Sequence, residues 1–126
     1  MDQRIQTAIA LMETQLQREL SLHEMAQSVN LSSSRLRHLF KAETGVAPAQ
    51  YLKVIRLRRA QELITTTYLT MKQVMSSVGV HDTGHFAKDF KRIYGVTPAE
   101  YRNRYREATP VAQNGRAVAL AKSAAK

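Results

Sequence analysis

Apolar residues recur at helical spacing along most of the chain, and no segment alternates in the manner of a strand. From about Gln3 to Leu16 they fall three or four residues apart, which predicts an amphipathic first helix. Its apolar face carries Ile5, Ile9, Met12 and Leu16. From about Ala49 to Ile64 the chain has apolar residues throughout and no Gly or Pro, which predicts a longer helix. The pattern therefore predicts an all-α protein.

The segments beside the longer helix form an internal repeat. Residues 20–51 and 69–101 agree at apolar, Gly and Pro positions, with an offset of 49 that becomes 50 after a one-residue insertion. The pairs at the second offset are Leu36 with Phe86, Phe40 with Phe90, Gly45 with Gly95, Val46 with Val96, Pro48 with Pro98 and Tyr51 with Tyr101. The chain therefore contains two copies of one supersecondary unit.

The first helix of each copy has a start signal. Ser21 and Thr70 stand in N-cap positions before an apolar-periodic segment. Glu24 and Gln73 follow three residues later. Both copies therefore match the capping-box pattern, in which the two side chains bond to each other's backbone N–H groups.

A second helix follows in each copy after a short turn. The first helix ends at a residue suited to a left-handed C-cap, Asn30 or Gly79. Ser32 and Asp82 can then cap the second helix, which ends at a glycine followed by a proline. A short helix, a turn and a second helix make up the helix-turn-helix pattern.

The charge of the chain is positive and localised. Nineteen Lys and Arg residues against ten Asp and Glu give a net charge of +9. Residues 35–106 hold fourteen of the bases and five acids, whereas residues 1–34 hold two bases and four acids. Such a basic block favours a polyanionic partner, either nucleic acid or anionic lipid, over the alternative of a merely solvated surface.

Several classes of protein are excluded or disfavoured. The chain has no cysteine, which excludes disulfide scaffolds, cysteine-ligated zinc and thiol nucleophiles. It has no apolar run long enough to span a bilayer and no signal-peptide pattern at its N-terminus. His81 and His85 are four residues apart but lack a third ligand at suitable spacing. We therefore expect a small cytoplasmic protein that is not an enzyme and holds no metal or cofactor.

Residues 78–102 read V-G-V-x3-G-H-F-x3-F-K-R-x-Y-G-V-T-P-A-E-Y-R. This segment resembles the C-terminal signature of AraC/XylS-type transcriptional regulators, and the first copy, with Arg56, Leu57 and Ala60 after it, matches the upstream half of the same module. The resemblance covers residues from about 3 to 106. It implies two three-helix subdomains joined by a long helix, about seven helices in all, and sequence-specific binding to duplex DNA in a bacterial-type regulator.

The chain departs from the family pattern in two respects. The second helix of copy two opens with Asp82, Thr83, Gly84 and His85, where many members have polar residues able to contact bases. Larger members also carry a ligand-sensing or dimerisation domain, so a stand-alone regulator and a C-terminal part of a larger one both remain open.

The repeat suggests a division into four parts. Residues 1–48 and 65–106 would form the two helix-turn-helix subdomains, with residues 49–64 as the linker helix between them. Residues 107–126 contain Pro110 and Gly115 and are rich in Ala. We expect this tail to be disordered, with a short helix over residues 116–125 as the alternative.

Helical spacing gives the second helix of copy one a core face and an opposite face. The core face takes Leu36, Leu39, Phe40 and the aliphatic stem of Glu43. A helix in the major groove presents its opposite face to base edges, where Arg can bind guanine bidentately. In copy one this opposite face holds Ser34, Arg37, His38 and Lys41. Fifty residues later, the same face of copy two holds Gly84, Ala87, Lys88 and Lys91. The base-reading candidates are Ser34, Arg37, His38 and Lys88.

The remaining polar residues of the two helix-turn-helix units suit phosphate contacts, which fix the position of the protein without reading sequence. These candidates are Ser32, Arg35, Lys41, Thr83, His85, Lys91 and Arg92. Gly84 and Ala87 have no side chain long enough to contact a base. We therefore expect copy one to carry most of the discrimination between DNA sequences and copy two to anchor the protein on the DNA. Tyr51 and Tyr101 are expected to pack on the core of their subdomains, a DNA contact being the less favoured alternative.

The sequence therefore predicts a transcription regulator whose DNA module is monomeric and reads two adjacent major grooves, with RNA polymerase as a further candidate partner. One alternative is a basic helical module that docks on RNA polymerase or another regulator and has little sequence-specific DNA binding. A membrane-surface or RNA binder is disfavoured, because no aromatic platform for unstacked bases is present.

Overall fold

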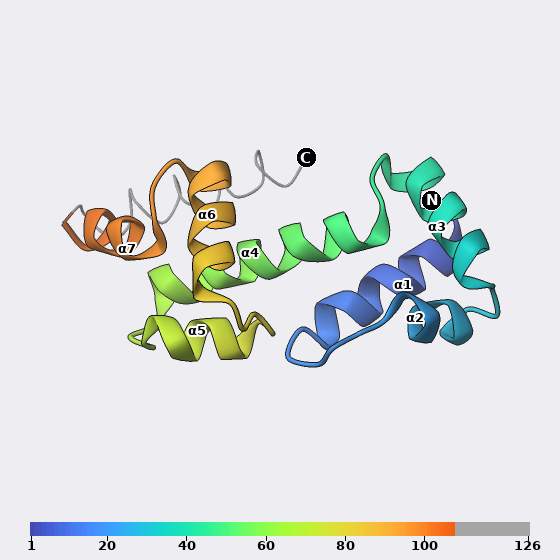
Figure 1. The fold of residues 1–126 in the computed structure, drawn as a ribbon, viewed down its shortest axis with the longest axis horizontal. Coiled ribbons are helices and arrows are strands. Elements are labelled where there is room, and N and C mark those ends of the chain that lie inside the picture. The colour runs from blue at the N-terminus through green and yellow to red at the C-terminus, as the bar shows by residue number, and fades with distance from the viewer. Residues whose placement is uncertain (108–126) are drawn as a thin grey trace. The chain divides into compact units, whose positions relative to one another are not determined.

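The computed structural model describes residues 1–107, which form seven α-helices and no strand, so the predicted all-α fold is confirmed (Figure 1). The expected disordered tail and its helical alternative fall on residues 108–126, outside the described residues, while residue 107 closes the last helix. The helices are α1 (Gln3–Thr14), α2 (Leu22–Ser28), α3 (Ser33–Thr44), α4 (Pro48–Thr66), α5 (Met71–Ser77), α6 (Thr83–Tyr94) and α7 (Pro98–Glu107).

The chain divides into two compact units, one from Met1 to Ile55 and one from Arg56 onward. The boundary lies within α4, the helix expected from about Ala49 to Ile64. Our four-part division of the chain stays a prediction. None of the helices of residues 1–107 is both long and apolar enough to cross a membrane.

The first unit packs α1, α2, α3 and the start of α4 around one apolar core. Phe40 is completely buried, and its ring meets that of Tyr51 edge to face at a centroid distance of 5.3 Å. Tyr51 therefore packs on the core as expected. The buried members of this core are Ile5, Ala8, Met12, Leu20, Met25, Ala26, Val29, Leu36, Phe40, Leu52 and Ile55.

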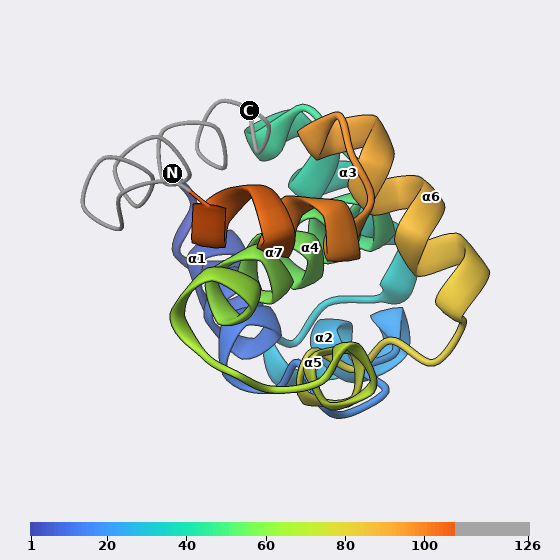
Figure 2. The ribbon, with the colours of Figure 1, turned by 90° about the vertical axis from the view of Figure 1, so that its left-hand side faces the viewer.

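The second unit repeats this arrangement with α5, α6 and α7 gathered around the C-terminal half of α4 (Figures 1 and 2). Phe90 is completely buried and meets the ring of Tyr101 edge to face at 5.5 Å, as Phe40 meets Tyr51. The sequence repeat is therefore also a repeat of packing. The buried members are Leu57, Ala60, Ile64, Val74, Met75, Val78, Phe86 and Phe90.

The predicted caps of the second helices are confirmed. The Ser32 hydroxyl accepts a hydrogen bond from the backbone N–H of Arg35 at 3.1 Å, and the Asp82 carboxylate accepts one from that of His85 at 2.9 Å. Asn30 adopts the left-handed conformation with φ 58°, and Gly79, Gly45 and Gly95 have positive φ as well. These caps satisfy backbone groups that the helix ends leave open.

Two local predictions are wrong. The first helix ends at Thr14 rather than Leu16, because periodicity shows which residues face a core but not where helical hydrogen bonding stops. Leu16 still packs against the core, from the loop. The capping box is complete at Thr70 and Gln73, but Ser21 makes only half of one, since the Glu24 carboxylate binds the Arg18 guanidinium instead.

A third prediction, the burial of the Glu43 stem, is also wrong. Glu43 is exposed, and its carboxylate accepts a hydrogen bond of 2.7 Å from the backbone N–H of Asp2. Asp2 caps α1, so the carboxylate extends toward the start of that helix instead of covering the core.

Candidate nucleic-acid interface

Helix α3 presents the polar face that its sequence predicts. Leu36 and Phe40 are completely buried, which turns the opposite side of the helix to solvent. The four residues of that side, Ser34, Arg37, His38 and Lys41, are all exposed. Ser32, at the N-cap, and Arg35, in the first turn, are exposed too. The structure thus brings together the predicted contact residues of copy one, whose roles toward DNA stay predictions.

The basic side chains of α3 have no acidic partners. Within residues 1–107, none of Arg35, Arg37 and Lys41 takes part in an ion pair. The acid of the same helix, Glu43, is bonded to the backbone N–H of Asp2. An approaching polyanion therefore has no intramolecular ion pair to break at this face. The guanidinium of Arg37 can offer two parallel N–H donors to one pair of acceptors.

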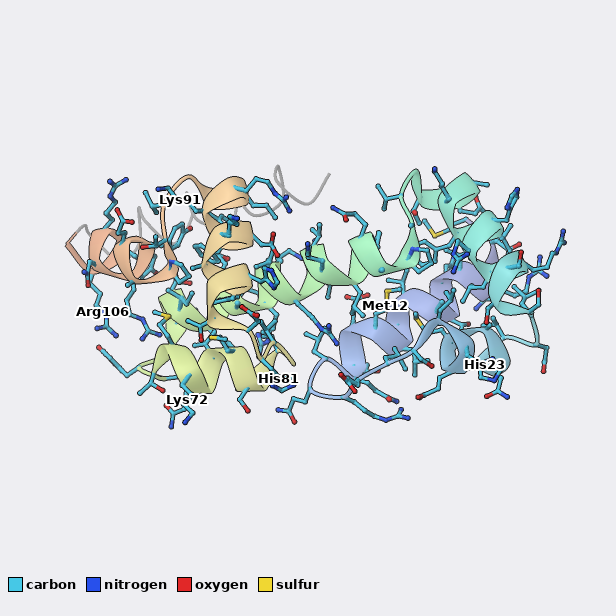
Figure 3. The ribbon with its side chains drawn as sticks, in the orientation of Figure 1. Met12, His23, Lys72, His81, Lys91 and Arg106 are labelled. Carbon is cyan, nitrogen blue, oxygen red and sulfur yellow. The ribbon has the colours of Figure 1, made fainter. Side chains whose placement is uncertain are left out.

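Helix α6 has the same orientation in its unit as α3 has, because Phe86 and Phe90 face the core. On the face that corresponds to the polar face of α3, Gly84 has no side chain and Ala87 is half-buried. Lys91 extends outward from the C-terminal half (Figure 3). The predicted contact residues of this helix are all exposed, namely Thr83, His85, Lys88, Lys91 and Arg92.

Two of these exposed groups on α6 have acidic neighbours. The Asp82 carboxylate lies 3.4 Å from Nδ1 of His85, and Asp89 pairs with the Arg92 guanidinium at 3.2 Å. The backbone N–H of His85 holds the pKa of the Asp82 carboxyl below its usual range, so this acid stays charged at the start of the helix. The pair between Asp82 and His85 is exposed on both sides and therefore weak, so a phosphate can displace it.

The two units differ in charge. Residues 1–55 hold six bases and five acids, whereas residues 56–107 hold ten bases and five acids. The second unit therefore supplies more of the general attraction for a polyanion. In the first unit the basic residues are concentrated on α3, and this helix therefore suits a contact with one short stretch of a polyanion.

Two buried or half-buried polar residues support the second unit and were not identified from sequence. The Arg102 guanidinium donates to the backbone carbonyls of Ile64, at 3.2 Å, Thr67 and Leu69. It thereby ties α7 to the end of α4 and to the loop that leads into α5. The available signal was the need of helix C-terminal carbonyls for donors, which Arg often supplies. Gln61, only 1% exposed, is the other residue.

The described residues offer no site for a metal ion. His81 lies in the turn between α5 and α6 (Figure 3). His85 lies in α6. Within residues 1–107, no group of three or more His, Asp or Glu side chains is placed to hold a metal. The predicted contact residues of α3 and α6 are hydrogen-bond donors and cations, which suit contacts with phosphates and base edges.

Two helix-turn-helix units, each exposing a basic second helix, define a DNA-binding helix-turn-helix protein. A family model described as a helix-turn-helix domain matches residues 25–104. The lactose operon transcription activator of Staphylococcus xylosus is 32% identical over 101 residues, 80% of this chain and 36% of that protein. The chain belongs to the AraC/XylS family of helix-turn-helix DNA-binding domains.

Solved structures support this assignment. An AraC-type transcriptional regulator from Chromobacterium violaceum is 30% identical, with a TM-score of 0.75 over 80% of this chain and 90% of that one. The DNA-binding domain of the global transcriptional factor AdpA, solved in complex with a target DNA, is 26% identical, with a TM-score of 0.80 over 86% and 98% of the chains. These similarities do not favour the alternative of a docking module with little sequence-specific DNA binding.

The chain spans about a third of the length of the curated relatives it matches. The shared portion is the helix-turn-helix module.

Proposed function

We propose that this chain binds duplex DNA sequence-specifically and thereby regulates transcription. The observation that carries the proposal is the exposed face of α3, on which Arg37, His38 and Lys41 stand beside one another without an acidic partner among the described residues. A relative of the same fold, the DNA-binding domain of AdpA, was solved with a target DNA. Two adjacent major grooves would take the two second helices.

The two units contribute differently in this proposal. Arg37 pairs bidentately with guanine O6 and N7, while His38 and Ser34 donate to neighbouring base edges. Lys41 and Arg35, on the flanks of α3, hold phosphates. On α6, Lys88 is the one further base-reading candidate. The other contacts of that helix go to phosphates, because Gly84 and Ala87, which begin the groove face, offer no long side chain.

Further partners follow from the same proposal. One chain carries both helix-turn-helix units, so the DNA module acts as a monomer unless the protein has a separate dimerisation domain, and RNA polymerase is a further candidate partner. The chain itself has no enzymatic activity and works in the cytoplasm, where the proposed DNA partner lies.

The experiment is selection of bound sequences from random duplexes. The protein is mixed with a random duplex library at fixed salt, the retarded complex is isolated on a gel, and the bound DNA is sequenced. A motif of defined base pairs supports the proposal. Weak retardation of all sequences alike would contradict it and favour a docking module.

A further inference from the structure

Gly84 differs from the other glycines of residues 1–107 in its backbone. Gly45, Gly79 and Gly95 have φ values of 86°, 74° and 84°, a region in which other side chains are strained. Gly84 lies in the first turn of α6 and has no positive φ. The backbone therefore gives no reason for a glycine at this position.

The packing gives no reason either. A Cβ atom built on Gly84 would meet only Oδ1 of Asp82, at 3.5 Å, which is an ordinary van der Waals contact. The residue is exposed, so no neighbouring helix presses against it. Glycine also destabilises a helix relative to alanine. For the protein alone, alanine would be the better residue.

The surface around Gly84 indicates what comes close to it. Gly84, Ala87, Lys88 and Lys91 share one face of α6 by their spacing. Both lysines are exposed, and no ion pair within residues 1–107 includes them. The charged Asp82 carboxylate lies beside Gly84. The face itself begins without a side chain and continues with two ammonium groups, which leave the helix backbone accessible and attract a polyanion to it.

We propose that Gly84 is a positioning residue at which duplex DNA comes into van der Waals contact with the backbone of α6. The missing side chain sets how deeply α6 sits against the duplex, and that depth lets Lys88 and Lys91 reach the DNA. The inference rests on the proposed function. It adds a residue whose role depends on the absence of a side chain. Ser34, at the matching position of α3, has a side chain and contacts the DNA through it instead.

The test is Gly84→Ala, examined for both thermal stability and affinity for the duplex selected by the wild type. The variant should melt a few degrees higher, because alanine favours the helix. It should bind the duplex about tenfold more weakly, since an added methyl group in a close contact must displace its neighbours. Gly84→Ser, which introduces the side chain of Ser34, should weaken binding as well.

Asn103→Ala provides the matched control. Asn103 is exposed in α7 of the same unit, and alanine there also raises helix propensity. This variant should melt higher than the wild type and bind DNA with unchanged affinity, so that stabilisation alone does not account for weaker binding.

Two results would overturn the inference. Wild-type affinity in Gly84→Ala would show that no DNA comes close to this residue, and a lower melting temperature would give the glycine a role in folding. If the wild type binds no duplex at all, the proposed function fails as well. That failure is recognised separately, because the wild type and Asn103→Ala would then be as inactive as Gly84→Ala.

Discussion

The Nε2 group of Gln61 donates a hydrogen bond of 3.1 Å to the hydroxyl of Tyr101, forty residues further along the chain. Gln61 lies in α4 and is 1% exposed, while Tyr101 lies in α7 and packs its ring on Phe90. The bond joins the helix that runs between the units to the last helix of the second unit. A buried amide without this acceptor would lose its hydration with no compensation.

Tyr101→Phe should therefore destabilise the second unit. The ring stays, but Gln61 loses its acceptor while buried, which costs about 1–3 kcal/mol. Urea unfolding measures the change in the free energy of unfolding. Tyr51→Phe is the matched control, since Tyr51 holds the equivalent place in the first unit and its hydroxyl has no hydrogen bond to another described residue. It should change stability by less than about 0.5 kcal/mol. Equal losses in the two variants would contradict the account.

Phe40→Ala and Phe90→Ala should each unfold their own unit. Both rings are completely buried at matching positions of the repeat, and such truncations cost about 3–5 kcal/mol. In a small unit that is most of the available stability. Circular dichroism during heating gives the measurement. If Phe40→Ala melts like the wild type and loses only DNA affinity, α3 must present the opposite face to that described.

Stability should fall in alkaline solution. Burial raises the pKa of the Tyr94 and Tyr101 hydroxyls above the ordinary value, so the fold favours their neutral forms. Their contribution is complete below the unfolded-state pKa of about 10 and is lost as the pH rises beyond it. Urea unfolding at pH 8 and near pH 11 tests this. Tyr94→Phe should show a smaller decline than the wild type, and an equal decline would refute the assignment.

DNA binding should depend steeply on salt. Arg35, Arg37, Lys41, Lys88, Lys91 and Arg92 are all exposed and together can neutralise six phosphates. A plot of log affinity against log salt concentration should then have a slope near −5. Fluorescence anisotropy with the selected duplex provides the measurement. A slope shallower than about −2 would show that these residues are not the binding surface.

The sequence predicted the fold well because the relevant information is local. Helical spacing and caps such as Ser32 and Asp82 are set by residues within a few positions of one another. The internal repeat also predicted the packing, because each copy places its tyrosine ring against its phenylalanine ring.

What the sequence did not predict depends on distant contacts. Gln61 faces Tyr101, and Arg102 reaches carbonyls 33 to 38 residues away, so no periodicity marks either of them. Glu43 follows the core spacing of α3, yet its carboxylate goes to the backbone of Asp2. The sequence shows that Gly84 has no side chain to contact DNA. Only its φ and the open space beside it in the structure show that folding does not require glycine there.

The division of labour between the units is the central claim, and base preference in two variants tests it most directly. Arg37→Ala and Lys88→Ala are each put through the selection from random duplexes, with affinity measured on the wild-type motif and on single-base-pair changes. Arg37→Ala should lose about 1–3 kcal/mol and relax the preference at one or two base pairs. Lys88→Ala, if α6 mainly anchors, should weaken all duplexes alike and leave the motif unchanged. An equal loss of discrimination in the two variants, or a motif that changes only in Lys88→Ala, would contradict the account.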